Sequence, residues 1–340
     1  MTAGIDGEAG TSARVPRRPE IRFALNAIQW VNVLEDPSDP DSRRLWRYAD
    51  PSFIDDYPAV LAEIRSAGFA AVMMEVLSVQ TLQNYAAMLR NAGLEVAPGY
   101  LPLPLPSDHG VALRRGTPEW VRWFDLTRRR AEESNFLGLD TVFVSPDVDE
   151  RLVRMRERAA VGAGFDQHRL DEFVELVTAA AEVLAHEGIR AGLHNHVGTW
   201  VETESEIDYV LANVDPTLLG ASFDIGHLEW AGIDSKSMLA KWSDRVIDLH
   251  LKDLDLNIAH DSRQRPRPYG DTADQGLFIE PGLGQIDLAG VLDTLPEDFA
   301  GWVIVEVDRA SMDPAASARQ SAAWVAEITS RRSHSPEGEQ

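Results

Sequence analysis

Hydrophobic and polar positions along this chain follow two alternating patterns. Short runs that are apolar throughout, as in parallel strands buried on both faces, alternate with segments whose apolar residues recur every three or four positions, as in helices. Leu82, Tyr85 and Leu89 form one such helical stripe, and Gly68 and Gly93 follow helical segments as terminators. The apolar runs predict strands at residues 21–30, 69–76, 94–101, 139–145, 191–196, 219–224, 246–252 and 302–307.

Eight strands that alternate with helices predict an α/β fold, a (β/α)8 TIM barrel, which occupies residues 21–330 as a single domain. The alternative is an open doubly wound sheet, which normally has a Gly-rich turn after its first strand. No such turn follows residues 21–30, so the barrel is favoured. Residues 1–20 and 331–340 contain few apolar positions, and we expect a disordered leader and a disordered tail.

Two segments of the predicted barrel are longer than the others. Residues 117–136 are expected to form one helix, and residues 254–285 a long loop at the barrel mouth. Thr203 and Glu206 have the spacing of a capping box, which predicts that a helix begins there, between the fifth and sixth strands.

Composition narrows the classes of function. The 340-residue chain has no cysteine, which excludes disulfides, thiolate metal ligands and cysteine nucleophiles. Its formal net charge of -23 opposes binding to nucleic acid or to anionic membranes. No apolar run approaches the roughly 20 residues of a membrane-spanning helix, and residues 1–20 lack the hydrophobic segment of a secretory signal. We therefore expect a cytoplasmic protein that acts on a small molecule.

Residues that can bind a metal ion or move a proton end several of the predicted strands. Because the carboxyl ends of barrel strands meet at one mouth, we expect these side chains to converge. Unpaired carboxylates and imidazoles are costly to bury, whereas Mn²⁺, Co²⁺, Zn²⁺ or Fe²⁺ would use them as ligands. The residues are Glu75 on the second strand, His194 and His196 on the fifth, Asp224 and His227 at the sixth, His250 and Lys252 at the seventh, and Glu306 on the eighth.

Four segments resemble the xylose-isomerase-like barrels, which include sugar isomerases, ketose 3-epimerases and inosose dehydratases. They read HNHVGT, FDIGHL, HLKD and GLGQID, and are most similar to the inosose-dehydratase-like branch. The resemblance covers residues 21–330 and implies one divalent metal ion, Mn²⁺ first and Co²⁺, Mg²⁺, Zn²⁺ or Fe²⁺ as alternatives. It implies the ligands His194, Asp224, His250 and Glu306, with His227 as a substrate contact or an extra ligand.

One position departs from that family pattern. Ketose epimerases carry a glutamate where this chain has His194, and they move a proton with two opposed glutamates, of which Glu306 remains here. The departure favours an imidazole base, His194 or His196, over a symmetric pair of carboxylates. A metal-polarised carbonyl beside an acidic C–H then leads to enolisation, followed by isomerisation or by loss of water. Lys252 is a candidate to stabilise the oxyanion.

The expected substrate is a sugar, keto-sugar or cyclitol, and the expected enzyme is an isomerase or a carbon–oxygen lyase. Glu75, His227, Trp30 and Trp200 are the candidate substrate contacts, although an indole near a strand end is also an ordinary core residue. One alternative is the catalytic subunit of a C-glycoside deglycosidase, which needs a small partner subunit. Others are a non-catalytic sugar-binding barrel and a nuclease like endonuclease IV, the latter opposed by the net charge. A homo-oligomer is compatible with the sequence.

Overall fold

A computed structural model describes residues 21–36, 38–39 and 42–334, so the predicted leader and residues 335–340 of the predicted tail lie outside the described residues. Parallel strands form the centre, in the order β5-β4-β1-β13-β10-β9-β8-β7-β6. Their bounds are β1 Arg22–Leu25, β4 Ala71–Met73, β5 Glu95–Ala97, β6 Tyr100–Leu103, β7 Thr141–Pro146, β8 Arg190–Leu193, β9 Leu219–Asp224, β10 Val246–Leu251 and β13 Trp302–Val305.

The third strand of the barrel closes the ring, and it consists of two parts, β5 and β6. β5 and β6 are two halves of one extended segment, separated by Pro98 and Gly99, and β5 pairs with β4 while β6 pairs with β7. Pro98 has no N–H to donate to a neighbouring strand, and Gly99 O accepts from Phe143 N at 3.0 Å. With β5 and β6 counted as one strand, the described residues form the predicted (β/α)8 barrel.

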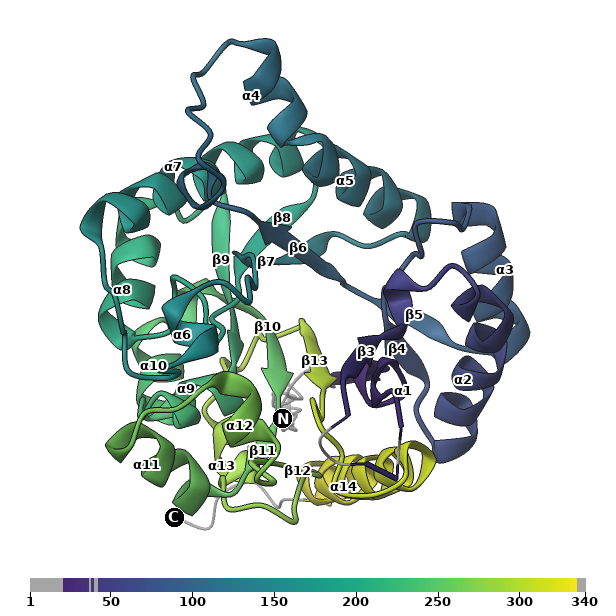
Figure 1. Cartoon of the computed structure of the whole chain (residues 1–340). Helices are drawn as coiled ribbons and strands as arrows, with labels where there is room; N and C mark the ends of the chain where they lie inside the picture. Colours follow the sequence, from purple (N-terminus) through teal and green to yellow (C-terminus); the bar gives the residue numbers. More distant parts are fainter. Residues whose placement is uncertain (1–20, 37, 40–41, 335–340) are drawn as a thin grey trace, which may run out of the picture.

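Helices surround the strands, as Figure 1 shows. The predicted terminators are confirmed: Gly68 and Gly93 end α2 and α3 with φ of 119° and 68°, a conformation that glycine adopts without strain. The capping box of Thr203 and Glu206 is also confirmed, at the start of α8. The outer helices are α2 Phe53–Ala67, α3 Leu82–Ala92, α5 Asp125–Leu137, α7 Gln167–His186, α8 Glu204–Asn213, α10 Ser235–Lys241, α13 Leu288–Asp293 and α14 Pro314–His334.

Two of the three hydrophobic clusters of the described residues fill and surround the barrel. A small cluster fills the inside of the barrel and includes Met73, Phe143 and Ile304. A larger cluster lies between the strands and the outer helices. Because side chains alternate along a strand, a residue two positions beyond the inner cluster faces the barrel mouth, as Glu306 does after Ile304.

The structure corrects several predicted segments. The first strand ends at Leu25, not at residue 30, and α1 (Ile28–Val31) follows it. The helix predicted at 117–136 is two helices, α4 (Pro118–Trp123) and α5, because Phe124 leaves helical geometry between them and buries its ring. The loop predicted at 254–285 contains α11, whose N-terminus is capped by Asp255 Oδ1, and also α12 and a strand pair.

Helix α14 extends to His334, past residue 331, where the tail was expected to begin. Among the described residues, no helix combines the length and the apolar character needed to cross a membrane.

The other helices and strands of the described residues are short. They are β2 Asn32–Leu34, β3 Arg44–Trp46, η1 Arg47–Ala49, η2 Pro106–His109, α6 Val153–Arg156, α9 Ile225–Trp230, η3 Ser243–Arg245, β11 Asp253–Leu254, α11 Leu256–Gln264, α12 Tyr269–Ala273 and β12 Phe278–Ile279.

Candidate metal centre and active site

The barrel mouth gathers most of the polar residues predicted from the strand ends. They come from the carboxyl ends of β8, β9, β10 and β13, which are neighbours in the ring. All are buried except His196, which is half-buried. The residues brought together are His194, His196, Asp224, His227, His250, Lys252 and Glu306.

The four predicted metal ligands form what we call the inner donor set: His194, Asp224, His250 and Glu306. His194 Nε2 lies 3.8 Å from Asp224 Oδ2, and His250 Nε2 lies 3.5 Å from Glu306 Oε2. The Tyr100 hydroxyl donates to Glu306 Oε2 at 3.3 Å and lies 3.1 Å from His194 Nε2. Because the single proton of the hydroxyl goes to Glu306, its oxygen accepts the proton of His194 Nε2.

Lys252 places a buried ammonium against three carboxylates. Its Nζ lies 2.7 Å from Asp308 Oδ1, 3.2 Å from Asp224 Oδ2 and 3.4 Å from Glu306 Oε1. Burial opposes the charge, but the carboxylates outweigh it and raise the pKa of Lys252. One ammonium cannot balance three carboxylates, and burial raises the pKa of Glu306 to about 8 and that of Asp224 to about 6. The cluster therefore takes up protons unless another cation is present.

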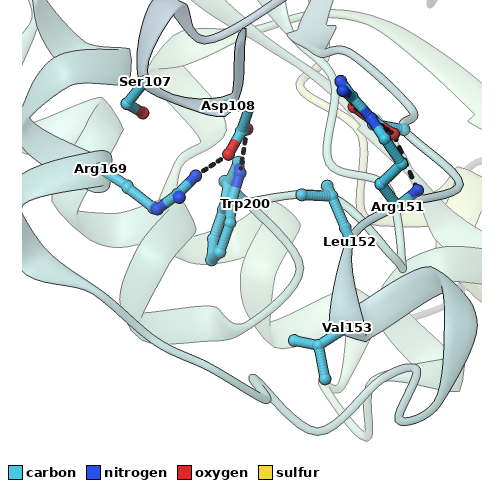
Figure 2. A pocket seen from close by; sticks show the side chains of 8 residues that line it. Ser107, Asp108, Arg151, Leu152, Val153, Arg169 and Trp200 are labelled. Carbon is cyan, nitrogen blue, oxygen red and sulfur yellow. Dashed lines mark hydrogen bonds and ion pairs between the residues drawn. The ribbon is translucent and has the colours of Figure 1, made fainter. Parts of the chain in front are cut away.

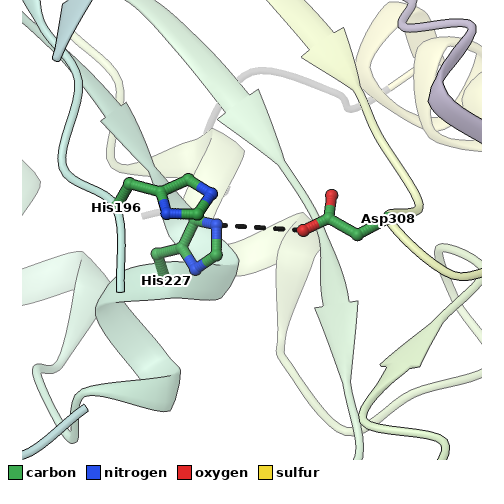
Figure 3. A group of neighbouring side chains, drawn as sticks. All are labelled: His196, His227 and Asp308. Carbon is green, nitrogen blue, oxygen red and sulfur yellow. Dashed lines mark ion pairs between the residues drawn. The ribbon is translucent and has the colours of Figure 1, made fainter. Parts of the chain in front are cut away.

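A second group of donors, the outer donor set, consists of His196, His227 and Asp308 (Figure 3). One donor atom from each lies within 4.8 Å of the others, and His227 Nε2 is 3.9 Å from Asp308 Oδ2. The two imidazole rings have their centres 3.9 Å apart. His196 Nδ1 lies 2.7 Å from Val197 O, and a carbonyl can only accept, so Nδ1 carries the proton and Nε2 keeps a free lone pair.

Burial keeps the histidines of both sets neutral. It lowers the pKa of His196 to about 4 and the pKa values of His194, His227 and His250 well below the ordinary value. The charge of Lys252 acts in the same direction on each of them. Unprotonated imidazoles are the form that binds a metal ion or accepts a proton.

The backbone around Asp224 holds the two donor sets together. Asp224 is the N-cap of α9, since its Oδ1 accepts from His227 N at 3.0 Å, while Oδ2 faces Lys252. The Asn195 side chain donates to Asp224 O at 3.2 Å and accepts from Asp224 N at 3.0 Å. Gly226 admits the lysine, because a Cβ at Gly226 would lie 2.6 Å from Lys252 Cβ.

Trp30 and Glu75, two of the predicted substrate contacts, are anchored by the outer helices. Trp30 Nε1 donates to Glu63 Oε2 of α2 at 2.7 Å, so its indole faces away from the donor sets. The backbone of Glu75 is held by two hydroxyls, with Tyr57 donating to Glu75 O and Glu75 N donating to Tyr85, both at 3.2 Å. A substrate contact at either residue stays a prediction.

Trp200, a third predicted contact, lines a separate pocket of about 290 Å³ (Figure 2). Its Nε1 donates to Asp108 Oδ2 at 2.8 Å, and Asp108 also pairs with Arg169. The Arg169 guanidinium lies 4.7 Å from the centre of the indole, and Arg151 pairs with Asp149 at the rim of the pocket. Trp200 is therefore fixed in a network of paired charges, outside the donor sets.

The family model of the xylose isomerase-like TIM barrel matches residues 61–328, which include most of the barrel. The chain belongs to this family.

Several relatives of this xylose isomerase-like barrel have curated names. An inosose dehydratase of Geobacillus kaustophilus is 30% identical over 262 residues, which cover 75% of this chain and 80% of the relative. The rhizopine catabolism protein MocC of Rhizobium meliloti is 30% identical over 293 residues, which cover 85% and 82%. The match to the inosose dehydratase of Lactiplantibacillus plantarum, 30% identical over 146 residues, covers 43% of this chain and 49% of the relative. The aligned part thus spans about half the length of some curated relatives.

Solved structures share this fold. An L-ribulose 3-epimerase superposes with a TM-score of 0.62 at 14% identity, over 94% of this chain and 99% of that one. The IolI protein, solved with a bound zinc atom, superposes with a TM-score of 0.60 at 15% identity, over 92% of this chain and 99% of that one. The probable 3-DHS dehydratase AsbF from Bacillus anthracis superposes with a TM-score of 0.60 at 13% identity, over 90% of this chain and 99% of that one. At these identities the likeness establishes the fold.

The sequence did not single out Asp308 of the outer donor set, nor Tyr100 and Tyr269, which contact the donor sets. Asp308 follows Glu306 by two positions and so faces the same side of the strand, a signal that could have found it. Tyr100 stacks on the His250 ring, with centres 5.0 Å apart. Tyr269 of α12 donates to Asp308 Oδ2 at 2.9 Å from within the predicted loop, where no pattern marked it.

Proposed function

We propose that this chain is a metal-dependent enzyme that removes a proton beside a carbonyl group of a sugar, keto-sugar or cyclitol, as an isomerase or a dehydratase. The observation that carries the proposal is the charge of the mouth, where three buried carboxylates face one ammonium and several neutral imidazoles. Relatives named inosose dehydratase support a cyclitol ketone as the substrate.

The residues at the mouth fit a divalent cation, which would balance the excess negative charge. In our proposal the ion is held by the outer donor set, with Asp224 Oδ2, 3.9 Å from His227 Nε2, as a further oxygen. Such nitrogen and oxygen donors suit Mn²⁺, our first candidate, and also Co²⁺, Zn²⁺ or Fe²⁺. When bound, the ion polarises a carbonyl and makes the adjacent C–H more acidic. The inner donor set, predicted from the sequence, is the alternative holder.

In this arrangement Glu306 is the candidate base. In the metal-free protein, burial raises the pKa of Glu306 to about 8, and a buried carboxylate is a stronger base than an exposed one. Tyr100 and Lys252 hold its two oxygens in place, at 3.3 Å and 3.4 Å. The Lys252 ammonium supplies positive charge for the oxygen that becomes negative as the proton leaves.

Proton exchange tests the proposal directly. The manganese-loaded protein is incubated with inosose in D₂O, and NMR follows the C–H signal beside the carbonyl and the dehydrated product. We expect wild type to exchange this proton and Glu306→Gln to be slower by about 100-fold or more. Glu95→Gln, the same change at an exposed position on β5, is the matched control and should keep the wild-type rate. A wild-type protein that neither exchanges nor dehydrates inosose or related keto-sugars contradicts the proposal.

The same assay separates the finer alternatives. Exchange with loss of water indicates a dehydratase, and exchange without it an isomerase. Aglycone release from a 3-keto-C-glycoside, together with co-purification of a small second chain, would favour the deglycosidase alternative. The cytoplasmic location expected from the sequence stays a prediction.

A further inference from the structure

A buried carboxamide near the mouth lacks a partner within the protein. Gln29 lies in α1, directly after β1, and is 4% exposed. In the described part of the chain, neither its Nε2 nor its Oε1 has a hydrogen-bond partner. Folding has removed both atoms from water without replacing their hydrogen bonds, which is unfavourable. A molecule that binds to the protein is therefore the expected partner.

The turn of α1 directs Gln29 away from the outer core. Ala27, Trp30 and Val31 belong to the cluster between strands and helices, and Ile28 packs against it. At about 100° per residue, these four positions fall within an arc of about 160° around the turn. Gln29 lies opposite the centre of that arc, about 180° away. Since it is also shielded from solvent, we infer that its side chain is directed towards the inside of the barrel mouth.

The same turn lies next to the strand that carries Glu306. β1 pairs with β13 in parallel, with Leu25 opposite Val305, and Asn26 N donates to Val305 O at 2.9 Å. Glu306 is the next residue after Val305. The turn that carries Gln29 therefore begins beside Glu306, at the same height along the two paired strands. The carboxamide therefore belongs to the wall of the mouth formed by β1 and β13.

An ion-pair bridge joins the chain after α1 to the outer donor set. Arg44, in the β2–β3 hairpin that follows α1, pairs with Asp274 at 2.8 Å. Asp274 also pairs with Arg309, which is the residue after Asp308. The segment that contains Gln29 is thereby held against the end of β13, where both donor sets have a carboxylate.

We propose that the Gln29 carboxamide binds two adjacent hydroxyl groups of the substrate ring and so selects polyhydroxylated substrates; this role rests on the function proposed above. An amide presents a donor and an acceptor side by side. Hydroxyl groups can accept from Nε2 and donate to Oε1, whereas an anion can only accept and a cation can only donate. A neutral ring with neighbouring hydroxyls satisfies both atoms of Gln29, whereas a fully ionised phosphate or carboxylate group satisfies only Nε2.

Gln29→Met tests this role, because methionine keeps the length of the side chain and removes both polar atoms. We expect the ligand-free variant to melt no more than about 2 °C below wild type, since no hydrogen bond within the protein is lost. On the manganese-loaded protein, the Kd for inositol, measured by titration calorimetry, should rise about tenfold or more. The KM for inosose should rise by a similar factor, with kcat unchanged within about threefold.

Gln80→Met is the matched control, at a glutamine that is also buried but fully paired. Gln80 Oε1 accepts from Leu77 N at 3.4 Å, and Nε2 donates to Asn84 Oδ1 at 2.8 Å. This variant should melt several degrees lower and bind inositol like wild type.

The outcomes separate the inference from the proposed function. If Gln29→Met binds inositol like wild type, the inference is wrong whatever its melting temperature. It is also wrong if the wild-type protein binds no inositol. If inositol binding is weakened in Gln29→Met but wild type never turns over inosose, the inference stands and the proposed function fails.

Discussion

The inner and outer donor sets contain the same kinds of side chain, yet His194 and His196 leave different nitrogens free, while His227 Nε2 accepts from Lys252 Nζ at 3.3 Å. In the inner set, His194 Nε2 lies 3.1 Å from the Tyr100 hydroxyl and donates a hydrogen bond to its oxygen. In the outer set, His196 uses Nδ1 for Val197 O at 2.7 Å and keeps the Nε2 lone pair. The type of residue at a strand end therefore does not decide its role; the partner of the other ring nitrogen does.

This difference leads to two arrangements of metal and base. With the ion in the outer set, Glu306 is left as the base. With the ion in the inner set, His196 is left as the base, as the sequence prediction allowed. Variants that change one set and spare the other distinguish the two arrangements.

Lys252, which contacts carboxylates of both sets, should give the largest effect. In metal-free Lys252→Met three buried carboxylates lose their counter-charge, and we expect a loss of about 3–5 kcal/mol in the free energy of unfolding, measured with urea. Adding Mn²⁺ should restore part of it. The control, Lys236→Met, breaks an exposed pair with Asp287 and should cost less than about 1 kcal/mol. Equal losses in the two variants would show that the buried ammonium does not hold the sets together.

The next largest effect concerns the affinity for Mn²⁺, measured by titration calorimetry on Asp308→Asn and Glu306→Gln. Each variant removes one negative charge and keeps the shape of the side chain. If the outer set holds the ion, Asp308→Asn should bind it more than about 100-fold more weakly and Glu306→Gln less than about tenfold. The reverse order would place the ion in the inner set and make His196 the base.

His196 of the outer set and Glu306 of the inner set should also respond to pH with opposite signs. The pKa of His196 falls to about 4 on folding, so the folded state binds fewer protons and its contribution to stability is lost as pH drops below about 6.5. The pKa of Glu306 rises to about 8, so its contribution is lost as pH rises from about 4.5 to about 8.

Unfolding of the metal-free protein in urea at several pH values between about 5 and 6.5 measures these contributions. Relative to wild type, His196→Gln should make stability rise less with pH, and Glu306→Gln should make it rise more. Each change amounts to at most about 1.4 kcal/mol per pH unit, less for the half-buried His196. Slopes that shift in the same direction would contradict the assigned pKa values.

The sequence predicts the barrel and the residues of the inner donor set because both depend on local patterns. Apolar runs mark strands, and polar residues at their ends, such as His250 and Glu306, must meet at one mouth. The outer set depends more on contacts between distant segments. Tyr269 reaches Asp308 across 39 positions, from a helix inside a segment that shows no periodicity. The sequence predicts one strand at residues 94–101, whereas the structure divides it at Pro98 and Gly99 into β5 and β6, which pair with different neighbours.

The smallest expected effects come from the two tyrosines, each of which holds one carboxylate of one set. Tyr269→Phe frees Asp308 Oδ2, and if Asp308 is a ligand, the loss of its orienting hydroxyl should weaken Mn²⁺ binding about tenfold. Tyr100→Phe frees Glu306 and His194, which should cost about 1 kcal/mol of stability and change Mn²⁺ affinity by less than about threefold. It should also shift the pH profile of kcat, since the base loses a hydrogen bond. If Tyr100→Phe weakens the metal more than Tyr269→Phe does, the ion belongs to the inner set, because a hydroxyl can orient only the ligand that it touches.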